Sequence, residues 1–346
     1  MKAREYPAVD LALLLAAGSA FLLNSQTGPH LPFFPLLSAL LLRLAAPYFF
    51  VAAGFFWGEA LYAAPDAAAQ RALTGRVCRR LGGKLLLYLP IVFAMRCCTA
   101  LLDGWAPGPF ARRTLLELLF FPRGPYWTLH ALLLALPLLL PPVRRGKEAC
   151  VLPCALLLYA FASLTLRYRD AVLTGPLGGA LRGYWEVFLS FKNALFFALY
   201  FVTAGLLTAK HRACIAEHAR LRRLVLLAGW ALLLIETLTA GPGAAGDRDA
   251  MALAFALLAP ALFACTAFGP GLPLRRPELL RRLAASAFLL HLPLVWGWTG
   301  VLRRLSILPE PRANAFVGAA LSAVSFGLIV TVLYRKRWKP FYDWII

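Results

Sequence analysis

The feature that most constrains this chain is a series of apolar stretches, each about as long as a bilayer is thick. A helix of about 20 apolar residues crosses the hydrocarbon core of a membrane. Ten such stretches follow one another, at residues 8–24, 43–63, 84–102, 126–142, 149–166, 190–208, 223–241, 250–268, 283–300 and 314–334. The chain is 61% hydrophobic and 15% charged, whereas soluble proteins are about 45–50% apolar and about 25% charged. We therefore expect an all-α polytopic membrane protein of about ten transmembrane helices, forming one domain over residues 1–346 without a soluble domain.

Basic residues predict how these helices are oriented. If the N-terminus lies inside, 23 of the 36 Lys and Arg residues fall in inside loops and 11 in outside loops, while Arg43 and Arg96 lie at or within stretches. An excess of basic residues marks cytoplasmic loops. We therefore expect both termini to be cytoplasmic and the protein to reside in a plasma membrane, that of a bacterium. The net charge of +20 then reflects membrane orientation, and we expect no nucleic-acid partner because no basic domain stands outside the apolar stretches.

Ionisable groups inside the stretches are candidate functional groups, because an unpaired charge in hydrocarbon is costly. They are Asp10, Arg43, Arg96, His130, Lys192 beside Asn193, Glu236 and His291. Each has a structural alternative: a carboxylate favours a helix start, Arg and Lys reach toward the interface, and a buried histidine forms core hydrogen bonds. Trp127 is likewise typical of the interfacial aromatic belt. Glu236 requires a partner or a proton, and its candidate role is to line a polar cavity together with a basic residue.

One apolar stretch carries a recognisable signature. "RLAAPYFFVAAGFF" (43–56) resembles the second-helix signature of the type-3 membrane acyltransferases, and is most similar to the membrane domain of vancomycin-resistance-type serine racemases. Further resemblances to that family follow in the expected order, in "REYPAVDLALLLAA" (4–17), "GPYWTLHALLLAL" (124–136), "FKNALFFALYFVTAGLL" (191–207), "RDAMALAFALLAP" (248–260) and "SAFLLHLPLV" (286–295). Together these segments cover most of the chain.

The resemblance implies a ten-helix membrane O-acyltransferase fold. Members take an acyl group from acyl-CoA, with no bound cofactor, and pass it to a hydroxyl group on an envelope acceptor or another small acceptor. Their first helix carries a basic residue thought to meet the donor phosphates and a His thought to act as base. Those two positions fall here on Leu13 and Asn24. Leucine does not bind phosphate and asparagine does not accept a proton, so the family mechanism does not transfer directly.

Two functions remain open from the sequence. In the first, a divergent acyltransferase uses His30, His130 or Glu236 in catalysis and binds substrate through Asn24, Arg43, Trp127, Lys192, Asn193 and His291. Its partners are the lipid bilayer, acyl-CoA and a hydroxyl-bearing envelope acceptor. In the second, an inactive family member carries or binds a small polar solute or amino acid, as the racemase-attached domains are thought to do with serine. We expect no metal, since Cys150 and Cys154 lack a second Cys pair or a His cluster.

Overall fold

The computed structural model describes residues 6–25, 33–102, 104, 106–120, 126–167, 169–176, 178–188, 190–240, 251–273, 277–304 and 310–335. Over these ranges the chain is helical and contains no strand, which confirms the all-α prediction. Among the described residues, seven helical segments are long and apolar enough to cross a membrane, at Pro7–Asn24, Leu36–Tyr62, Ala67–Cys98, Tyr126–Arg144, Glu148–Arg167, Leu279–Leu302 and Ala313–Val332. Two shorter apolar helices are Ala194–Lys210 and Ala254–Ala267. The chain is thus an integral membrane protein by its helices, and the number of ten spans stays a prediction.

The helices gather into two compact units. Unit 1 combines the two ends of the chain, residues 1–45 and 270–346, and unit 2 contains residues 46–269. The expectation of a single domain stays a prediction.

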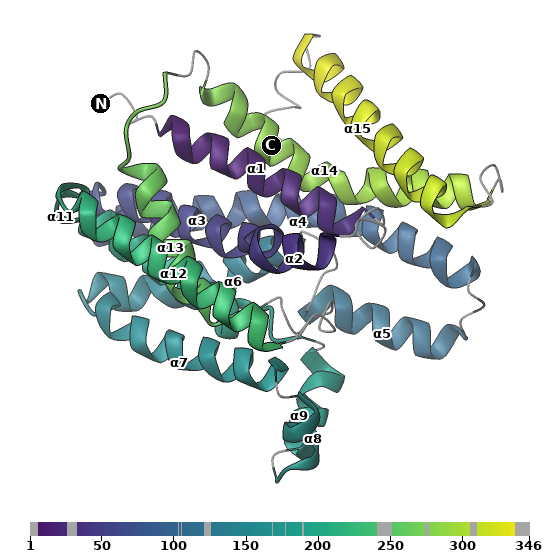
Figure 1. The fold of residues 1–346 in the computed structure, drawn as a ribbon, viewed down its shortest axis with the longest axis horizontal. Coiled ribbons are helices and arrows are strands. Elements are labelled where there is room, and N and C mark those ends of the chain that lie inside the picture. The colour runs from purple at the N-terminus through teal and green to yellow at the C-terminus, as the bar shows by residue number, and fades with distance from the viewer. Residues whose placement is uncertain are drawn as a thin grey trace. The chain divides into compact units, whose positions relative to one another are not determined.

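Unit 1 is built on a long central helix. Its elements are α1 (Pro7–Asn24), α2 (Phe34–Leu40), the 3-10 turn η2 (Leu42–Leu44), α14 (Pro277–Arg304) and α15 (Pro311–Arg335). Figure 1 shows α1 lying beside α14, and the contacts of α14 with both α1 and α15 confirm this packing. Pro7 begins α1, a position where proline loses no helical hydrogen bond, and Asp10 in the first turn favours the positive end of the helix dipole.

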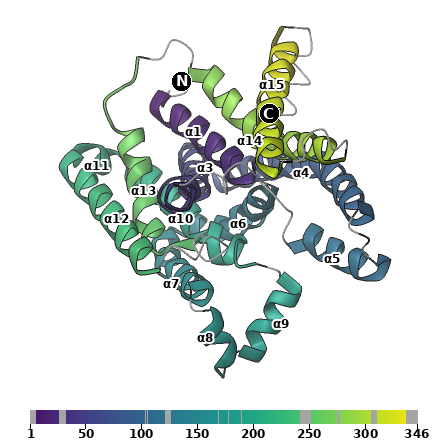
Figure 2. The same cartoon turned by 45° about the vertical axis from the view of Figure 1, so that its right-hand side comes forward.

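Unit 2 contains the remaining helices. They are α3 (Ala45–Tyr62), α4 (Ala67–Leu102), α5 (Pro107–Phe120), α6 (Tyr126–Arg144), α7 (Glu148–Arg167), α8 (Arg169–Thr174), α9 (Gly178–Phe188), the π-helix η3 (Ala194–Ala198), α10 (Leu199–Lys210), α11 (Arg212–Glu217), α12 (Ala219–Ala240) and α13 (Ala254–Ala267). Both views show α12 lying along α13 (Figures 1 and 2). One face of α12 exposes Leu221, Leu224, Leu227 and Leu238, a spacing that gives one helix face and suits contact with lipid chains.

Two glycines allow α3 and α10 to pack backbone against backbone. A Cβ at Gly54 would lie 2.1 Å from the carbonyl oxygen of Val202, and one at Gly205 would lie 2.0 Å from that of Val51. Small residues at such interfaces let membrane helices approach closely and pack by van der Waals contact. The signature stretch and the segment around 191–207 therefore form the centre of unit 2 together.

An aromatic cluster extends this centre to α6. Phe50 of α3 and Phe197 of η3 have ring centroids 5.7 Å apart, and Trp127 of α6 lies 5.5 Å from the first and 5.3 Å from the second. Phe50 and Phe197 are fully buried. The paired phenylalanines of two signature segments thus meet in the core, where edge-to-face ring pairs contribute beyond their buried area.

Polar contacts in unit 2 join helix ends that the charge distribution places on the same side of the membrane. Buried Glu148, at the start of α7, forms an ion pair with Lys210 at the end of α10 and accepts a hydrogen bond from the Tyr62 hydroxyl at the end of α3 (3.3 Å). All three ends are predicted to be cytoplasmic. Nearby in sequence, Arg212 pairs with Glu59 at 2.9 Å.

Candidate functional site

The last residue of α1 meets a histidine in the middle of α14. Nδ2 of Asn24 lies 3.3 Å from Nε2 of His291. His291 is only 3% exposed, whereas Asn24 is half-buried. Asn24, at the position that the resemblance assigns to the family's first-helix His, therefore contacts the imidazole of His291 in the late His-Leu-Pro segment. Both were predicted as substrate-binding residues, and unit 1 brings them together.

The neighbouring carbonyl groups define the protonation of this pair. Nδ1 of His291 faces the carbonyl oxygens of Phe288 at 2.8 Å and Ala287 at 3.1 Å. Carbonyl oxygens only accept hydrogen bonds, so Nδ1 carries the proton and Nε2 holds a lone pair. In the same way Nδ2 of Asn24 donates to the carbonyl of Ala20 at 2.8 Å, which fixes its amide orientation. Asn24 is thus the donor and Nε2 of His291 the acceptor.

A second polar contact joins the same two helices. Arg281 binds the carboxylate of Asp10 through two hydrogen bonds, Nε to Oδ1 at 2.8 Å and Nη2 to Oδ2 at 3.2 Å. Asp10 is completely buried, while the Arg281 side chain is half-exposed. Because Asp10 precedes Asn24 and Arg281 precedes His291, the two contacts show that α1 and α14 run in the same direction, as the alternating assignment of loops expects for the first and ninth stretches.

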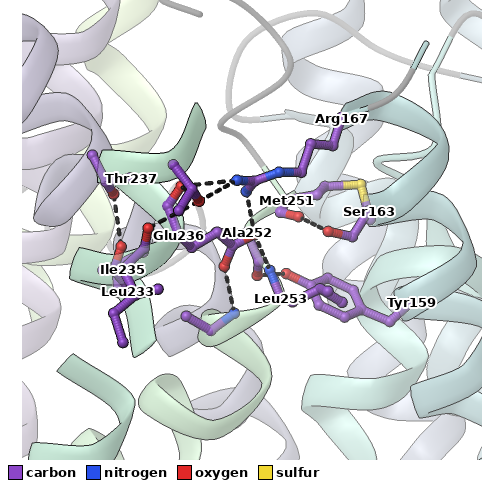
Figure 3. Close-up of polar contacts among 12 residues, drawn as sticks. Tyr159, Ser163, Arg167, Leu233, Ile235, Glu236, Thr237, Met251, Ala252 and Leu253 are labelled. Atoms are coloured by element: carbon purple, nitrogen blue, oxygen red, sulfur yellow. Dashed lines mark hydrogen bonds and ion pairs between the residues drawn. The ribbon is translucent and has the colours of Figure 1, made fainter. Parts of the chain in front are cut away.

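Glu236 has the basic partner that its position predicted (Figure 3). It lies four residues before the end of α12, where Nη1 of Arg167, the last residue of α7, donates to its Oε1 at 3.0 Å. Its carboxylate also accepts the backbone N–H groups of Leu253 and Ala254, each at 3.0 Å, at the start of α13. Through these contacts the carboxylate connects the ends of α7 and α12 with the start of α13, which is a structural role. A polar cavity at Glu236 stays a prediction.

Asn193 begins the π-helix η3. Its Oδ1 accepts the backbone N–H groups of Leu195 and Phe196, and its Nδ2 donates to the hydroxyl of Tyr184 at 2.8 Å. Burial raises the pKa of Tyr184 to about 12, an effect that the hydrogen bond from Asn193 partly offsets. Asn193 is therefore an N-cap whose side chain also anchors α9. Half-buried Lys192 directly precedes it.

The other predicted site residues are placed separately. Trp127 lies in the aromatic cluster of unit 2, and His130 follows it by one turn of α6 and is half-buried. Arg43 lies in η2, and its Nε donates to the hydroxyl of Ser38 at 3.0 Å. His30 lies outside the described residues. The candidate catalytic roles of His30, His130 and Glu236 stay predictions.

Three partners in contacts between helices were not assigned from the sequence: Glu117, Glu148 and Arg281. Arg96 pairs with Glu117 of α5 at 3.2 Å, and both side chains are buried. Arg281 was counted only among the basic residues of inside loops and Glu148 was not considered, yet each belongs to a contact between helices. Their position at the start of a stretch was the available signal, since charges near helix ends pair across neighbouring helices when those ends share a membrane face. Within the described ranges, no three His, Cys, Asp or Glu residues gather as metal ligands do.

A family model described as an acyltransferase domain matches residues 12–335 of the chain. The match covers nearly the whole sequence, so the chain belongs to this family, the type-3 membrane acyltransferases that its signature stretches resemble. No curated protein matches the chain, and no solved structure matches it. The departures that the resemblance assigns to Leu13 and Asn24 stay a prediction.

Proposed function

We propose that this protein is an integral-membrane O-acyltransferase of the bacterial cytoplasmic membrane, with cytoplasmic termini. It moves an acyl group from acyl-CoA to a hydroxyl group on an envelope or other small acceptor. The single observation that supports activity despite Asn24 is the pair of Asn24 with His291. It supplies a neutral imidazole, whose Nε2 lone pair accepts the Asn24 amide at the helix position that the resemblance assigns to the family's base. A general base needs such a lone pair within hydrogen-bond reach of the acceptor hydroxyl.

The proposed chemistry requires only one proton acceptor. The acceptor hydroxyl displaces the Asn24 amide and donates its proton to Nε2 of His291 as its oxygen attacks the thioester carbonyl carbon. A C–O bond forms and the C–S bond breaks, and the CoA sulfur leaves with the proton that His291 returns. The carbonyls of Ala287 and Phe288 hold the Nδ1–H of His291 throughout, as the orienting group does in other base-assisted acyl transfers.

The test is acyl transfer by the purified protein in nanodiscs, with short- and long-chain labelled acyl-CoA and a bacterial envelope fraction as acceptor. We expect His291→Ala to lower the rate about 100-fold or more, within the range that a positioned general base contributes. His130→Ala is the matched control and leaves the rate within about threefold if His130 takes no part in proton transfer. An active protein in which only His130→Ala removes activity would overturn the role given to His291.

The competing function is that of an inactive relative. The resemblance of the signature stretch to the membrane domains of serine racemases, with Leu13 and Asn24 in place of the family pair, also supports a carrier or binding protein for a small polar solute or amino acid. Wild-type protein that transfers no acyl group from any acyl-CoA, but takes up labelled serine in proteoliposomes, would replace the acyltransferase proposal with this one.

A further inference from the structure

An open groove lies between α11, α12 and α13 of unit 2. Its volume is about 290 Å³. Its walls are the apolar side chains of Ile215, Leu221, Val225, Ala261 and Ala264. Leu221 is more than half exposed, whereas Ala261 and Ala264 are buried at the floor. The groove is therefore a hydrocarbon-lined space open to the surroundings of the helices.

The side chain of Arg222 is held in place at this groove. Arg222 lines it, and the Nη1 of Arg222 donates to the carbonyls of Ile215 and Ala216, while Nη2 donates to that of Phe268 at 2.8 Å. Its Nε is buried and has no hydrogen-bond acceptor in the part of the chain that the structure describes. No described carboxylate forms an ion pair with it. Carbonyl groups and the ring of Phe268, whose centroid lies 6.0 Å from Cζ, orient the guanidinium, and no carboxylate in the described ranges neutralises it.

The surroundings of the groove add positive charge. The exposed residues Arg220 and Arg223 flank Arg222 in α12. Glu217 is the one acidic residue between 210 and 223. The charge distribution places this segment at the cytoplasmic face, where anionic lipids attract basic residues. An apolar groove flanked by basic residues is complementary to a molecule with an acyl chain and an anionic head group.

We propose that the groove binds an anionic phospholipid of the inner leaflet. One acyl chain lies between α12 and α13 against Val225 and Ala264, and the phosphate lies near Arg222 and the exposed Arg223. The exposed Leu224 and Leu227 continue the apolar face of α12 beyond the groove, which places the site at a lipid boundary. This binding site is separate from acyl transfer, because it uses no residue of the Asn24–His291 pair.

The experiment measures lipid retention by native mass spectrometry of the full chain released from nanodiscs. The nanodiscs contain equal amounts of phosphatidylglycerol and phosphatidylcholine with identical chains. We expect phosphatidylglycerol to be retained about fivefold more, the effect of one basic residue near an anionic surface. Arg222→Gln removes this preference, and Arg145→Gln, at another exposed basic position predicted on the same side, keeps it.

Because Arg222 also bonds three carbonyls, its substitution can disturb folding, so a second variant tests the groove itself. Val225→Trp fills the groove and lowers retention of both lipids, whereas Leu234→Trp, at an exposed position on the same helix, does not. Equal retention of the two lipids by the wild type, or full retention by Val225→Trp, overturns the proposal. Displacement by long-chain acyl-CoA at a lower concentration than by phosphatidylglycerol also overturns it, since the groove then serves the acyl donor. None of these outcomes depends on acyl-transfer activity.

Discussion

Asn24 donates a hydrogen bond to Nε2 of His291, over 267 residues of sequence and between two helices of unit 1. The distance of 3.3 Å is long for a hydrogen bond between an amide and an imidazole. A longer contact is easier for an incoming hydroxyl group to replace. The pair therefore supports both a structural contact of α1 with α14 and the proposed exchange of Asn24 for substrate.

Replacing Asn24 by Leu should weaken unit 1. The substitution keeps the approximate shape but leaves buried Nε2 of His291 without its donor, and an unsatisfied buried polar atom costs about 1–3 kcal/mol. Thermal unfolding of the detergent-solubilised protein measures the loss. Ser19→Ala on the same helix is the control, because the Ser19 hydroxyl bonds only the carbonyl of Leu15 in its own helix. An Asn24→Leu variant as stable as Ser19→Ala would show that the hydrogen bond from Asn24 to His291 does not stabilise unit 1.

The ion pair of Asp10 and Arg281 should respond unequally to removal of its two members. Arg281→Ala strands a fully buried carboxylate, whereas Asp10→Asn leaves a half-exposed guanidinium that water can solvate. We expect Arg281→Ala to lower the free energy of unfolding by about 2–3 kcal/mol, less than the 3–5 kcal/mol lost when a fully buried pair is broken. Asp10→Asn should lower it by less. Unfolding midpoints of the single and double variants measure this, with Arg304→Ala at the exposed end of α14 as control. Equal losses for both single variants would argue against the burial of Asp10.

Gly54→Ala and Gly205→Ala should each disrupt unit 2. The added methyl groups would lie 2.1 Å and 2.0 Å from backbone carbonyl oxygens, which cannot rotate away as a side chain can. Overpacking costs about 1–3 kcal/mol where side chains adjust, and we expect the upper end or more here. Gly83→Ala in α4 has open space around its new methyl group and should gain up to about 1 kcal/mol from helix propensity. The yield of folded protein and the unfolding temperature distinguish the Gly54 and Gly205 substitutions from the Gly83 substitution.

Glu236→Ala should loosen the start of α13. The carboxylate accepts the first free N–H groups of that helix and neutralises Arg167, so its loss should cost about 1–3 kcal/mol. Hydrogen exchange followed by mass spectrometry should show faster exchange for a peptide that contains Leu253 and Ala254. Glu186→Ala, at an exposed position of α9, is the control and should leave that exchange unchanged. Unchanged exchange in Glu236→Ala would instead favour the predicted role of Glu236 in a substrate site.

The sequence by itself determined the class of protein and much of its helix pattern. Apolar length and the surplus of basic residues in alternate loops are local properties of the chain, so α1, α6, α7 and α15 begin and end close to their predicted bounds. The resemblance to the family was also visible in the sequence, because it depends on the local order of residues such as Pro47 and the paired phenylalanines in the stretch 43–56. The need of Glu236 for a basic partner followed from the cost of a charge in hydrocarbon.

Only the tertiary structure decided which polar groups meet. The sequence separates Asn24 from His291 and Asp10 from Arg281 by most of the chain, and no periodicity connects them. It also left Trp127 open between a membrane-belt residue and a binding residue, whereas packing places it against Phe50 and Phe197. Helix formation depends on neighbouring residues, but a pair contact depends on the packing and rotation of two helices. The candidate base at His291 was visible in the sequence as a residue, and its tautomer and its partner came from the fold.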